Sequence, residues 1–142
     1  MAERTAIVSA EVEIVVPFHD IDPMGVVWHG HYAKYFEIAR CALLDKIDYN
    51  YPQMKESGYI WPIIELWVRY PRPVRFDQRL RVRAELFEWE LRMTIRYLVT
   101  DVVTGQRLTR GHTVQAAVHA ATGEMCFVCP EVLRRKLSLA TP

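Results

Sequence analysis

Apolar and polar residues alternate along most of this chain, a pattern typical of strands that bury one face of a sheet. The first such segment covers residues 6–16, where valines and an isoleucine alternate with Glu11 and Glu13. Further segments follow beyond residue 59, and a period of two in each favours antiparallel pairing. These segments are 60–70, 79–86, 91–99 and 107–120. The sequence therefore predicts an antiparallel sheet of five strands.

The spacing of apolar residues changes at His31 to that of a helix. The residues that recur every three or four positions are Tyr32, Tyr35, Phe36, Ala39, Leu43 and Ile47. No Pro or Gly interrupts them before Pro52, which predicts one long and mostly buried helix. Residues 49–58 have the composition of a turn. Pro130 opens a short C-terminal helix, at a position where its missing N–H costs no hydrogen bond.

The order of these elements is strand, helix, four strands and a short helix, which indicates an α+β fold and not a doubly wound sheet. One long central helix laid on a curved five-stranded sheet fits this order. The length of 142 residues suits a single domain that covers 1–142. Because such a sheet leaves edge strands uncovered, we expect a homo-oligomer, either a dimer or a dimer of dimers (a homotetramer).

The net charge and the distribution of apolar residues limit the classes of function that we expect. The formal net charge is +1, so the chain lacks the positive excess that is typical of nucleic-acid binders. No window approaches the roughly 20 apolar residues that span a bilayer, and the first residues lack the pattern of a signal peptide. We therefore expect a cytoplasmic protein that binds neither nucleic acid nor membrane.

Cys126 and Cys129 form a CxxC motif, and Cys41 is the third cysteine. The sequence has no second CxxC and no nearby histidine pair that would complete a zinc site. The motif follows an apparent antiparallel strand, whereas redox pairs usually stand before a helix in a βαβ unit. We expect small, buried side chains at the end of a strand, with a redox or metal role as the alternative.

The segment DIDPMGVVWHGHYAKYF, residues 20–36, places many titratable groups directly before the long helix. A carboxylate such as that of Asp22 can attack a carbonyl or activate water for the attack. The first N–H groups of a helix can stabilise the negative charge that develops on the carbonyl oxygen. A loop that folds back toward the helix could hold both groups against one carbonyl, as in an acyl-transfer enzyme.

The same segment has other interpretations. Asp22 before Pro23 is also typical of an Asx turn, and Asp20 is expected to be a solvated loop acid. His19 and His31 are expected to be surface groups. A metal site would draw its ligands from His19, Asp20, Asp22, His29 and His31. However, His29 and His31 are two positions apart and diverge once a helix has begun, so we expect no metal.

The motif in this segment resembles that of the hotdog-fold acyl-CoA thioesterases, in particular the 4-hydroxybenzoyl-CoA thioesterase family. The matching positions are Asp22, Gly25, Val26, Val27, His29, Tyr32, Tyr35, Phe36 and Glu37, followed later by Tyr70-Pro71-Arg72-Pro73 and Phe76-Asp77. The chain departs from the family at Phe18, where many members have a tyrosine, and at Gln78, where a small or aliphatic residue is common. No catalytic hydroxyl can therefore be carried over to position 18.

The resemblance implies hydrolysis of an acyl or aroyl thioester to the free acid and CoA, with water as the only other reactant and no cofactor. By analogy, Asp22 acts as general base or nucleophile, and the backbone N–H of His29 or Gly30 binds the carbonyl oxygen. The His29 side chain would orient water or the carbonyl. Gly25 would allow a positive φ or a close approach of the backbone.

The substrate contacts are expected from four residues. Trp28 and Tyr32 would shape the acyl pocket, although aromatic residues at such positions are more often part of the core. Arg72 and Arg75 would meet the phosphates of the pantetheine arm across a dimer interface. The same thioester chemistry allows an acyl-carrier-protein substrate in place of acyl-CoA.

Two other functions remain open from the sequence. A hotdog 3-hydroxyacyl-thioester dehydratase or hydratase would depend on His29 and use Asp22 only in support. An acyl-thioester binding protein would keep the pocket without turnover.

Overall fold

The computed structural model describes residues 5–141. Its strands are β1 (Val8–Val15), β2 (Tyr59–Ile60), β3 (Ile63–Arg69), β4 (Arg79–Glu88), β5 (Met93–Asp101), β6 (Arg107–Gln115) and β7 (Val118–His119). Its helices are α1 (Tyr32–Lys46), α2 (Tyr51–Ser57) and α3 (Glu131–Ala140), with short 3-10 turns η1 (Phe18–Asp20) and η2 (His29–His31).

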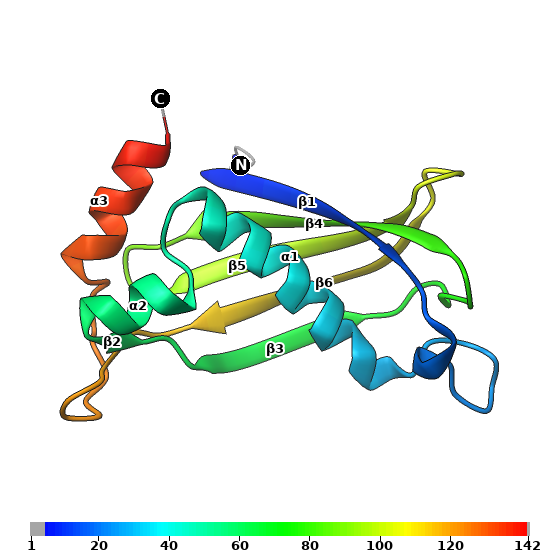
Figure 1. The fold of residues 1–142 in the computed structure, drawn as a ribbon, viewed down its shortest axis with the longest axis horizontal. Coiled ribbons are helices and arrows are strands. Elements are labelled where there is room, and N and C mark those ends of the chain that lie inside the picture. The colour runs from blue at the N-terminus through cyan, green and yellow to red at the C-terminus, as the bar shows by residue number, and fades with distance from the viewer. Residues whose placement is uncertain (1–4, 142) are drawn as a thin grey trace.

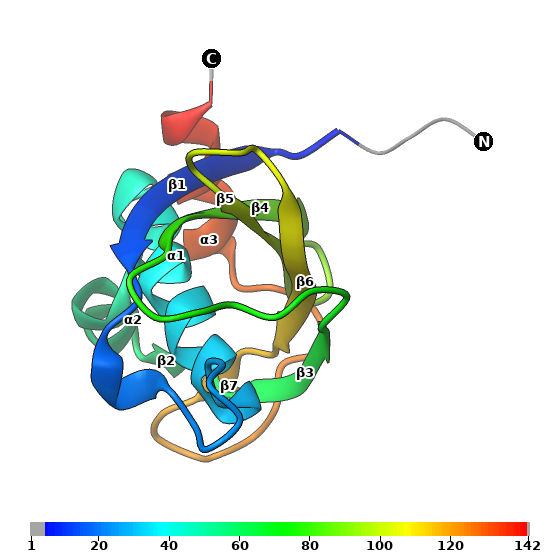
Figure 2. The same cartoon turned by 90° about the vertical axis from the view of Figure 1, so that its right-hand side faces the viewer.

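Five strands form one antiparallel sheet in the order β1-β4-β5-β6-β3, and β2 and β7 form a separate pair (Figure 1). The sheet curves around α1, which lies along its concave side, as Figure 2 shows from the end where α1 begins. The predicted α+β hotdog architecture, with a central helix and a five-stranded sheet, is confirmed.

The core lies between α1 and the sheet. Phe36 of α1 stacks on Tyr97 of β5, with ring centroids 4.5 Å apart and an angle of 5° between the planes. Gly111 of β6 lies against this pair. A Cβ atom at Gly111 would come within 2.5 Å of the Phe36 ring and 2.6 Å of the Trp67 carbonyl oxygen. Only a glycine therefore lets the helix approach the sheet this closely.

The predicted long helix is confirmed as α1, but residues 49–58 are not a simple turn. Asp48 adopts a φ of 55°, which ends the helical run, and Asn50 then caps α2. The Asn50 side chain accepts the Tyr51 N–H at 2.8 Å, and the Asn50 N–H donates to Gln53 Oε1 at 3.0 Å. This capping box makes a second helix of a segment whose composition resembles a turn.

The segments 60–70 and 107–120 were each expected to be one strand, and each is divided between two sheets. Pro62 separates β2 from β3, because a proline has no N–H to donate to a ladder. Its carbonyl instead accepts the Ala116 N–H at 3.4 Å, at the point where β6 has ended and β7 has not begun. The expectation of two uninterrupted strands is therefore wrong.

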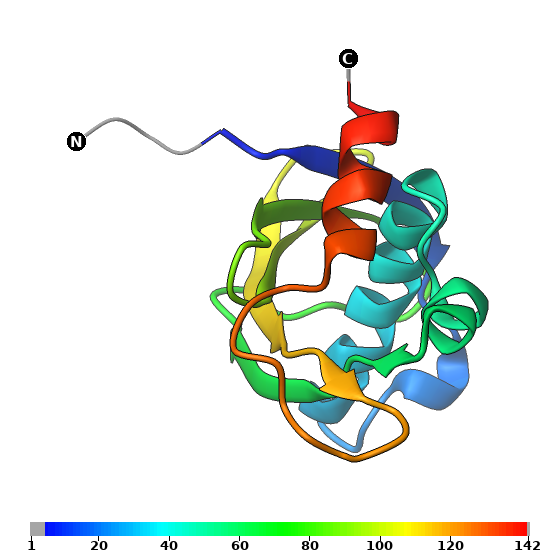
Figure 3. The same ribbon diagram turned by 90° about the vertical axis from the view of Figure 1, so that its left-hand side faces the viewer.

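The predicted C-terminal helix is confirmed as α3. It buries Leu133 and Leu137 and lies beside the end of the sheet that is distant from the start of α1 (Figure 3). Among the helices of residues 5–141, none combines the length and the apolar composition needed to cross a bilayer.

A methyl group at Gly111 tests the contact between helix and sheet. We expect Gly111→Ala to lower the free energy of unfolding by about 1–3 kcal/mol, because the ring of Phe36 and the Trp67 carbonyl cannot both move aside. Urea titration should show a lower midpoint with an unchanged slope. A change of less than about 0.5 kcal/mol, the range of surface substitutions, would contradict the close packing described here.

Candidate active site

The loop between β1 and α1 folds into a small hairpin. Ile21 and Val27 form an isolated antiparallel bridge, and the Asp22 N–H donates to the Val26 carbonyl at 2.8 Å. The Gly25 N–H donates to the Asp22 carbonyl at 2.9 Å, and Gly25 has a φ of 80°. A left-handed residue at this point suits glycine, which explains why the turn can be so tight.

Asp22 lies at the tip of this hairpin. Its Oδ1 accepts the Met24 N–H at 2.9 Å, which is the geometry of an Asx turn. An ionised carboxylate has two oxygens with about four acceptor positions, and this turn occupies one of them. The carboxylate is half-buried. Holding the turn and reacting with a substrate are therefore compatible roles for Asp22.

The start of the helical segment follows directly after the hairpin. Neither Trp28, before η2, nor His31, before α1, caps the helix with its side chain within the described residues. The first N–H groups of a helix have no acceptor inside the helix, so those of His29 and Gly30 are candidates for binding a carbonyl oxygen. The Tyr70 hydroxyl donates to the His29 carbonyl at 2.8 Å and fastens this turn to the end of β3.

The helix start is surrounded by the aromatic side chains of Trp28, Tyr32 and Tyr70. The Trp28 ring is 47% exposed and lies 5.0 Å from the His29 ring and 5.3 Å from the His31 ring. A Cβ atom at Gly30 would come within 2.2 Å of the Trp28 ring, so a larger residue here would have to displace this ring. Tyr32 is buried and packs edge-on against Tyr70 at 4.9 Å. Trp28 and His29 are thus open to solvent, whereas Tyr32 is part of the core.

Asp20 is the main residue that the sequence interpretation misjudged. It is 1% exposed, so the expectation of a solvated loop acid is wrong. Its Oδ1 accepts from Lys34 Nζ at 2.7 Å, and its Oδ2 accepts from the Tyr35 hydroxyl at 2.5 Å. Nε2 of His19 and Nε2 of His31 each lie 3.8 Å from Oδ1.

These contacts decide the ionisation of Asp20. Burial alone would raise the pKa of the carboxyl, because it disfavours the charged form. The hydrogen bonds from Lys34 and Tyr35, together with the charges of Lys34 and His31, outweigh burial and lower its pKa below the ordinary value. The same contact has the opposite effect on Tyr35, whose pKa is raised by burial and by the neighbouring carboxylate. Asp20 is therefore a buried anion that binds the first turn of α1.

The two predicted arginines lie on the turn between β3 and β4, and both are exposed. The Arg72 N–H donates to the Leu108 carbonyl at 3.2 Å, and the Arg75 N–H donates to Gln78 Oε1 at 2.9 Å. Gln78 also donates to Asp101 at 2.7 Å, so it braces this turn against the β5–β6 connection. That bridge gives a structural reason for glutamine where the family commonly has a smaller residue.

Position 18 lies beside the same turn. Phe18 packs edge-on against Phe76, with ring centroids 5.6 Å apart, and both rings are largely exposed. Position 18 therefore presents no aromatic hydroxyl, as the sequence indicates.

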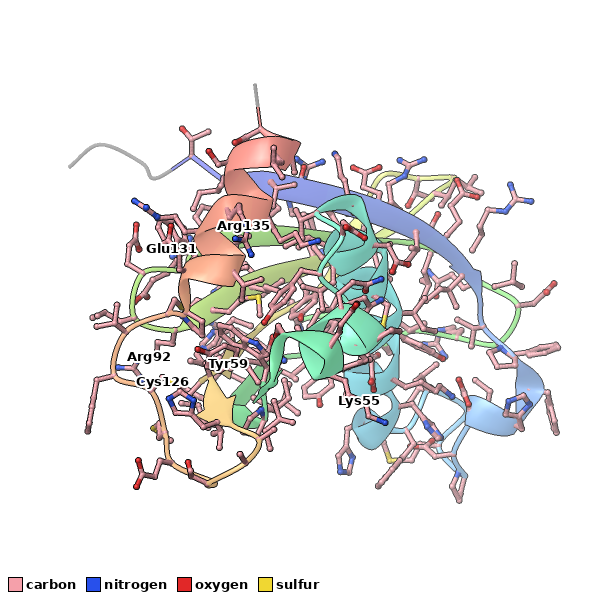
Figure 4. All side chains as sticks on the ribbon, turned by 60° about the vertical axis from the view of Figure 1, so that its left-hand side comes forward. Lys55, Tyr59, Arg92, Cys126, Glu131 and Arg135 are labelled. Carbon is pink, nitrogen blue, oxygen red and sulfur yellow. The ribbon has the colours of Figure 1, made fainter. Side chains whose placement is uncertain are left out.

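The CxxC motif lies far from this loop. In Figure 4 the labelled Cys126 is at the opposite end of the molecule from the blue loop that precedes α1. All three cysteines are free. Burial, followed by the charges of Glu90 and Glu88, raises the pKa of Cys129 to about 12, which keeps it a thiol. Within residues 5–141 no group of three or more His, Cys, Asp or Glu side chains is arranged to hold a metal ion.

Comparison with known proteins points to one family. The model of the Thioesterase-like superfamily matches residues 16–137. A DHNA-CoA thioesterase from Staphylococcus aureus has a similar structure, with a TM-score of 0.77, 27% identity, and coverage of 84% of this chain and 80% of that one. The structure of a hypothetical protein from Thermus thermophilus is similar with a TM-score of 0.80 and 31% identity, and the match covers 92% of this chain and 98% of that one. The acyl-CoA thioester hydrolase YbgC of Escherichia coli is 27% identical over 71 residues, which cover 50% of this chain and 53% of that protein.

The depressed pKa of Asp20 predicts how stability depends on pH. The ionised carboxylate stabilises the fold above the ordinary carboxyl pKa of 3.8, and this contribution is lost as the pH falls through the lower folded-state pKa. We expect Asp20→Asn to cost about 2–4 kcal/mol at pH 7, with the difference from wild type shrinking below about pH 4. Chemical denaturation at several pH values measures this difference.

A matched control is Asp48→Asn, because Asp48 also pairs with a lysine at 2.7 Å but is 73% exposed. Its cost should stay within about 0.5 kcal/mol, as for exposed ion pairs. Equal effects of the two substitutions, or a difference for Asp20 that persists unchanged at pH 3, would contradict the buried ion pair.

Proposed function

Because the chain belongs to the Thioesterase-like superfamily, we propose that it hydrolyses an acyl- or aroyl-CoA thioester to the free acid and CoA. One observation carries the proposal: the carboxylate of Asp22 lies at the tip of a hairpin that leads directly into an uncapped helix start. A carboxylate and free helical N–H groups are the two parts that thioester hydrolysis requires. The names of the S. aureus and E. coli relatives support this reaction and not another.

In the proposed reaction, the N–H groups of His29 and Gly30 donate to the thioester oxygen and stabilise its charge as the carbonyl is attacked. As general base, Asp22 accepts a proton from water, and the resulting hydroxide adds to the carbonyl carbon. The carbon–sulfur bond then breaks, and the thiolate takes the proton back from Asp22. As nucleophile, Asp22 would add to the carbon itself and expel the thiolate of CoA, and water would then hydrolyse the mixed anhydride to the free acid and the Asp22 carboxylate.

His29 has an exposed ring beside Trp28, which suits the orientation of water or of the carbonyl. Trp28 is proposed to contact the acyl group, since its ring is exposed at the helix start. Tyr32 would reach that group only from inside the core, where its ring is buried, so its role as a substrate contact stays a prediction. No cofactor is needed, because water is the only second reactant.

Arg72 and Arg75 are proposed to bind the phosphates of CoA. Both follow Tyr70, whose hydroxyl contacts the His29 carbonyl, so the turn that carries them begins beside the helix start. Guanidinium groups pair well with phosphate oxygens in an exposed turn. An acyl-carrier-protein thioester would present the same reacting carbonyl and a phosphate on its pantetheine arm.

We propose further that the site is completed by a second copy of the chain. β3 lies at the edge of the sheet, yet Ile63, Ile64 and Leu66 are apolar and 41–48% exposed. An apolar hollow of about 580 Å³ is lined by residues that include Met54, Trp61 and Pro62, and it therefore lies next to Ile63, the first residue of β3. Antiparallel pairing of two β3 edges would cover these residues and bring the hollow of one copy toward the helix start of the other.

Asp22→Asn tests the reaction. We expect thiol release from a panel of short, long and aromatic acyl-CoA esters to fall roughly a hundredfold or more, because Asn keeps the size and the turn but cannot accept a proton or attack. Asp48→Asn, a matched change at the other end of α1, should retain the wild-type rate. Circular dichroism and thermal unfolding verify that both variants fold.

The outcomes separate the candidate functions. Wild type that binds acyl-CoA but releases no thiol across the panel would favour the binding protein. Hydration of an enoyl thioester without thiol release, retained in Asp22→Asn but lost in His29→Ala, would favour the dehydratase or hydratase. In a single turnover in labelled water, an anhydride that water opens at the aspartyl carbon places one unlabelled protein oxygen in the first product, and this product would identify Asp22 as the nucleophile.

Leu66→Lys tests the proposed dimer. A charge on the exposed edge of β3 should prevent pairing of two sheets, so light scattering should show a monomer and thiol release should fall about tenfold or more. Leu139→Lys is the control, because Leu139 is 80% exposed on α3 and away from that edge. A monomeric wild type with full activity would exclude this arrangement.

A further inference from the structure

We propose that Asp20 is a positioning residue for the reaction: its buried carboxylate fixes the Asp22 hairpin to α1 and thereby sets where Asp22 lies relative to the helix start. This inference rests on the proposed function. It assigns to Asp20 no contact with the substrate, since the side chain is closed off from solvent.

Asp20 joins two parts of the site because its backbone and its side chain bind different elements. Its carbonyl accepts the Trp28 N–H at 3.0 Å, which closes the base of the hairpin. Its carboxylate binds Lys34 and Tyr35, both in the first turn of α1. Asp22 follows Asp20 by two residues and His29 follows Trp28 directly, so one residue fixes the catalytic carboxylate and the oxyanion site to the same turn of helix.

The charge of Asp20 is what makes this connection rigid. His19, His31 and Lys34 all present nitrogen atoms within 4 Å of Oδ1, and the Tyr35 hydroxyl donates to Oδ2. Hydrogen bonds to an ionised group are roughly twice as strong as those between neutral groups. A buried charge that lost these partners would be costly, so the loop has one favoured position on the helix.

The hairpin has a second anchor that does not involve Asp20. The buried Val27 donates its N–H to the Val74 carbonyl at 2.8 Å, in the turn between β3 and β4. Removal of the Asp20 charge should therefore loosen the hairpin at one side without unfolding it. A displacement of about 1 Å at a reacting group is enough to cost on the order of a hundredfold in rate.

A double-mutant cycle of Asp20→Asn and Asp22→Asn is the test. Alone, Asp20→Asn should lower kcat about 10- to 100-fold and change KM less than about threefold, because the ground-state contacts of the substrate remain. In the Asp22→Asn background the same substitution should change the residual kcat less than about twofold, since the carboxylate that it positions is already absent. Equal fold-losses in both backgrounds would overturn the proposal and leave Asp20 a purely structural residue.

Hydrogen exchange provides a readout that does not depend on activity. In Asp20→Asn, amides of residues 21–28 should exchange at least about tenfold faster, whereas those of β4 and β5 should be unchanged. Unchanged protection of residues 21–28 in Asp20→Asn would overturn the proposal. Absence of thiol release by wild type would refute only the proposed function, so the two failures can be told apart. Asp48→Asn, at an aspartate that is 73% exposed and lies 2.7 Å from its lysine partner, should alter neither readout.

Tyr35→Phe gives a milder version of the test, and it replaces Asp20→Asn if that variant does not fold. It removes the bond to Oδ2 and leaves the bond from Lys34. We expect a loss of kcat about 3- to 10-fold, again absent in the Asp22→Asn background. A wild-type kcat in Tyr35→Phe, with wild-type protection of residues 21–28, would overturn the proposal.

Discussion

The close contact between α1 and the sheet is the constraint on which the site depends. Phe36 can stack on Tyr97 only because Gly111 has no side chain, and this contact fixes the helix inside the curve of the sheet. The first turn of the helix then has one position, which directs its free N–H groups and places Lys34 and Tyr35 where the loop arrives. The helix dipole adds about half a positive charge at this end. Packing in the core therefore decides the geometry of a site at the surface.

The buried carboxylate of Asp20 connects that core to the loop. Removing a carboxylate from water is costly, and the cost is offset only when its partners are in place. An apolar contact at the same point would persist after small shifts of the loop. The hydrogen bonds from Lys34 and Tyr35, by contrast, form in only one orientation of the Asp20 carboxylate. The buried carboxylate therefore fixes the orientation of the loop on the first turn of α1. The two acids of the DxD spacing thus differ in environment: Asp20 is buried, whereas Asp22 is half-buried in the hairpin.

Sequence patterns predicted the elements whose period is regular and missed those that depend on local caps or on pairing partners. The strands of the sheet and α1 followed from periods of two and of 3.6, and Pro130 marked α3. The capping box of Asn50 and Gln53 was a signal for α2, but the composition of residues 49–58 concealed it. The burial of Asp20 could not be predicted, because two acids in one loop look alike until the fold places a lysine and a tyrosine beside one of them.

The exposed apolar residues of β3 are the basis of the proposed pairing with a second copy of the chain. On β4 and β5 the inward-facing residues Leu80, Val82, Met93 and Ile95 are fully buried, whereas Ile64 and Leu66 on β3 are almost half exposed. These two exposed residues are among those that the proposed dimer would cover. Tyr70 extends this edge to the His29 carbonyl, so whatever covers β3 also contacts the turn that carries the proposed oxyanion site. In the proposed dimer, assembly and chemistry would therefore be coupled through this one strand.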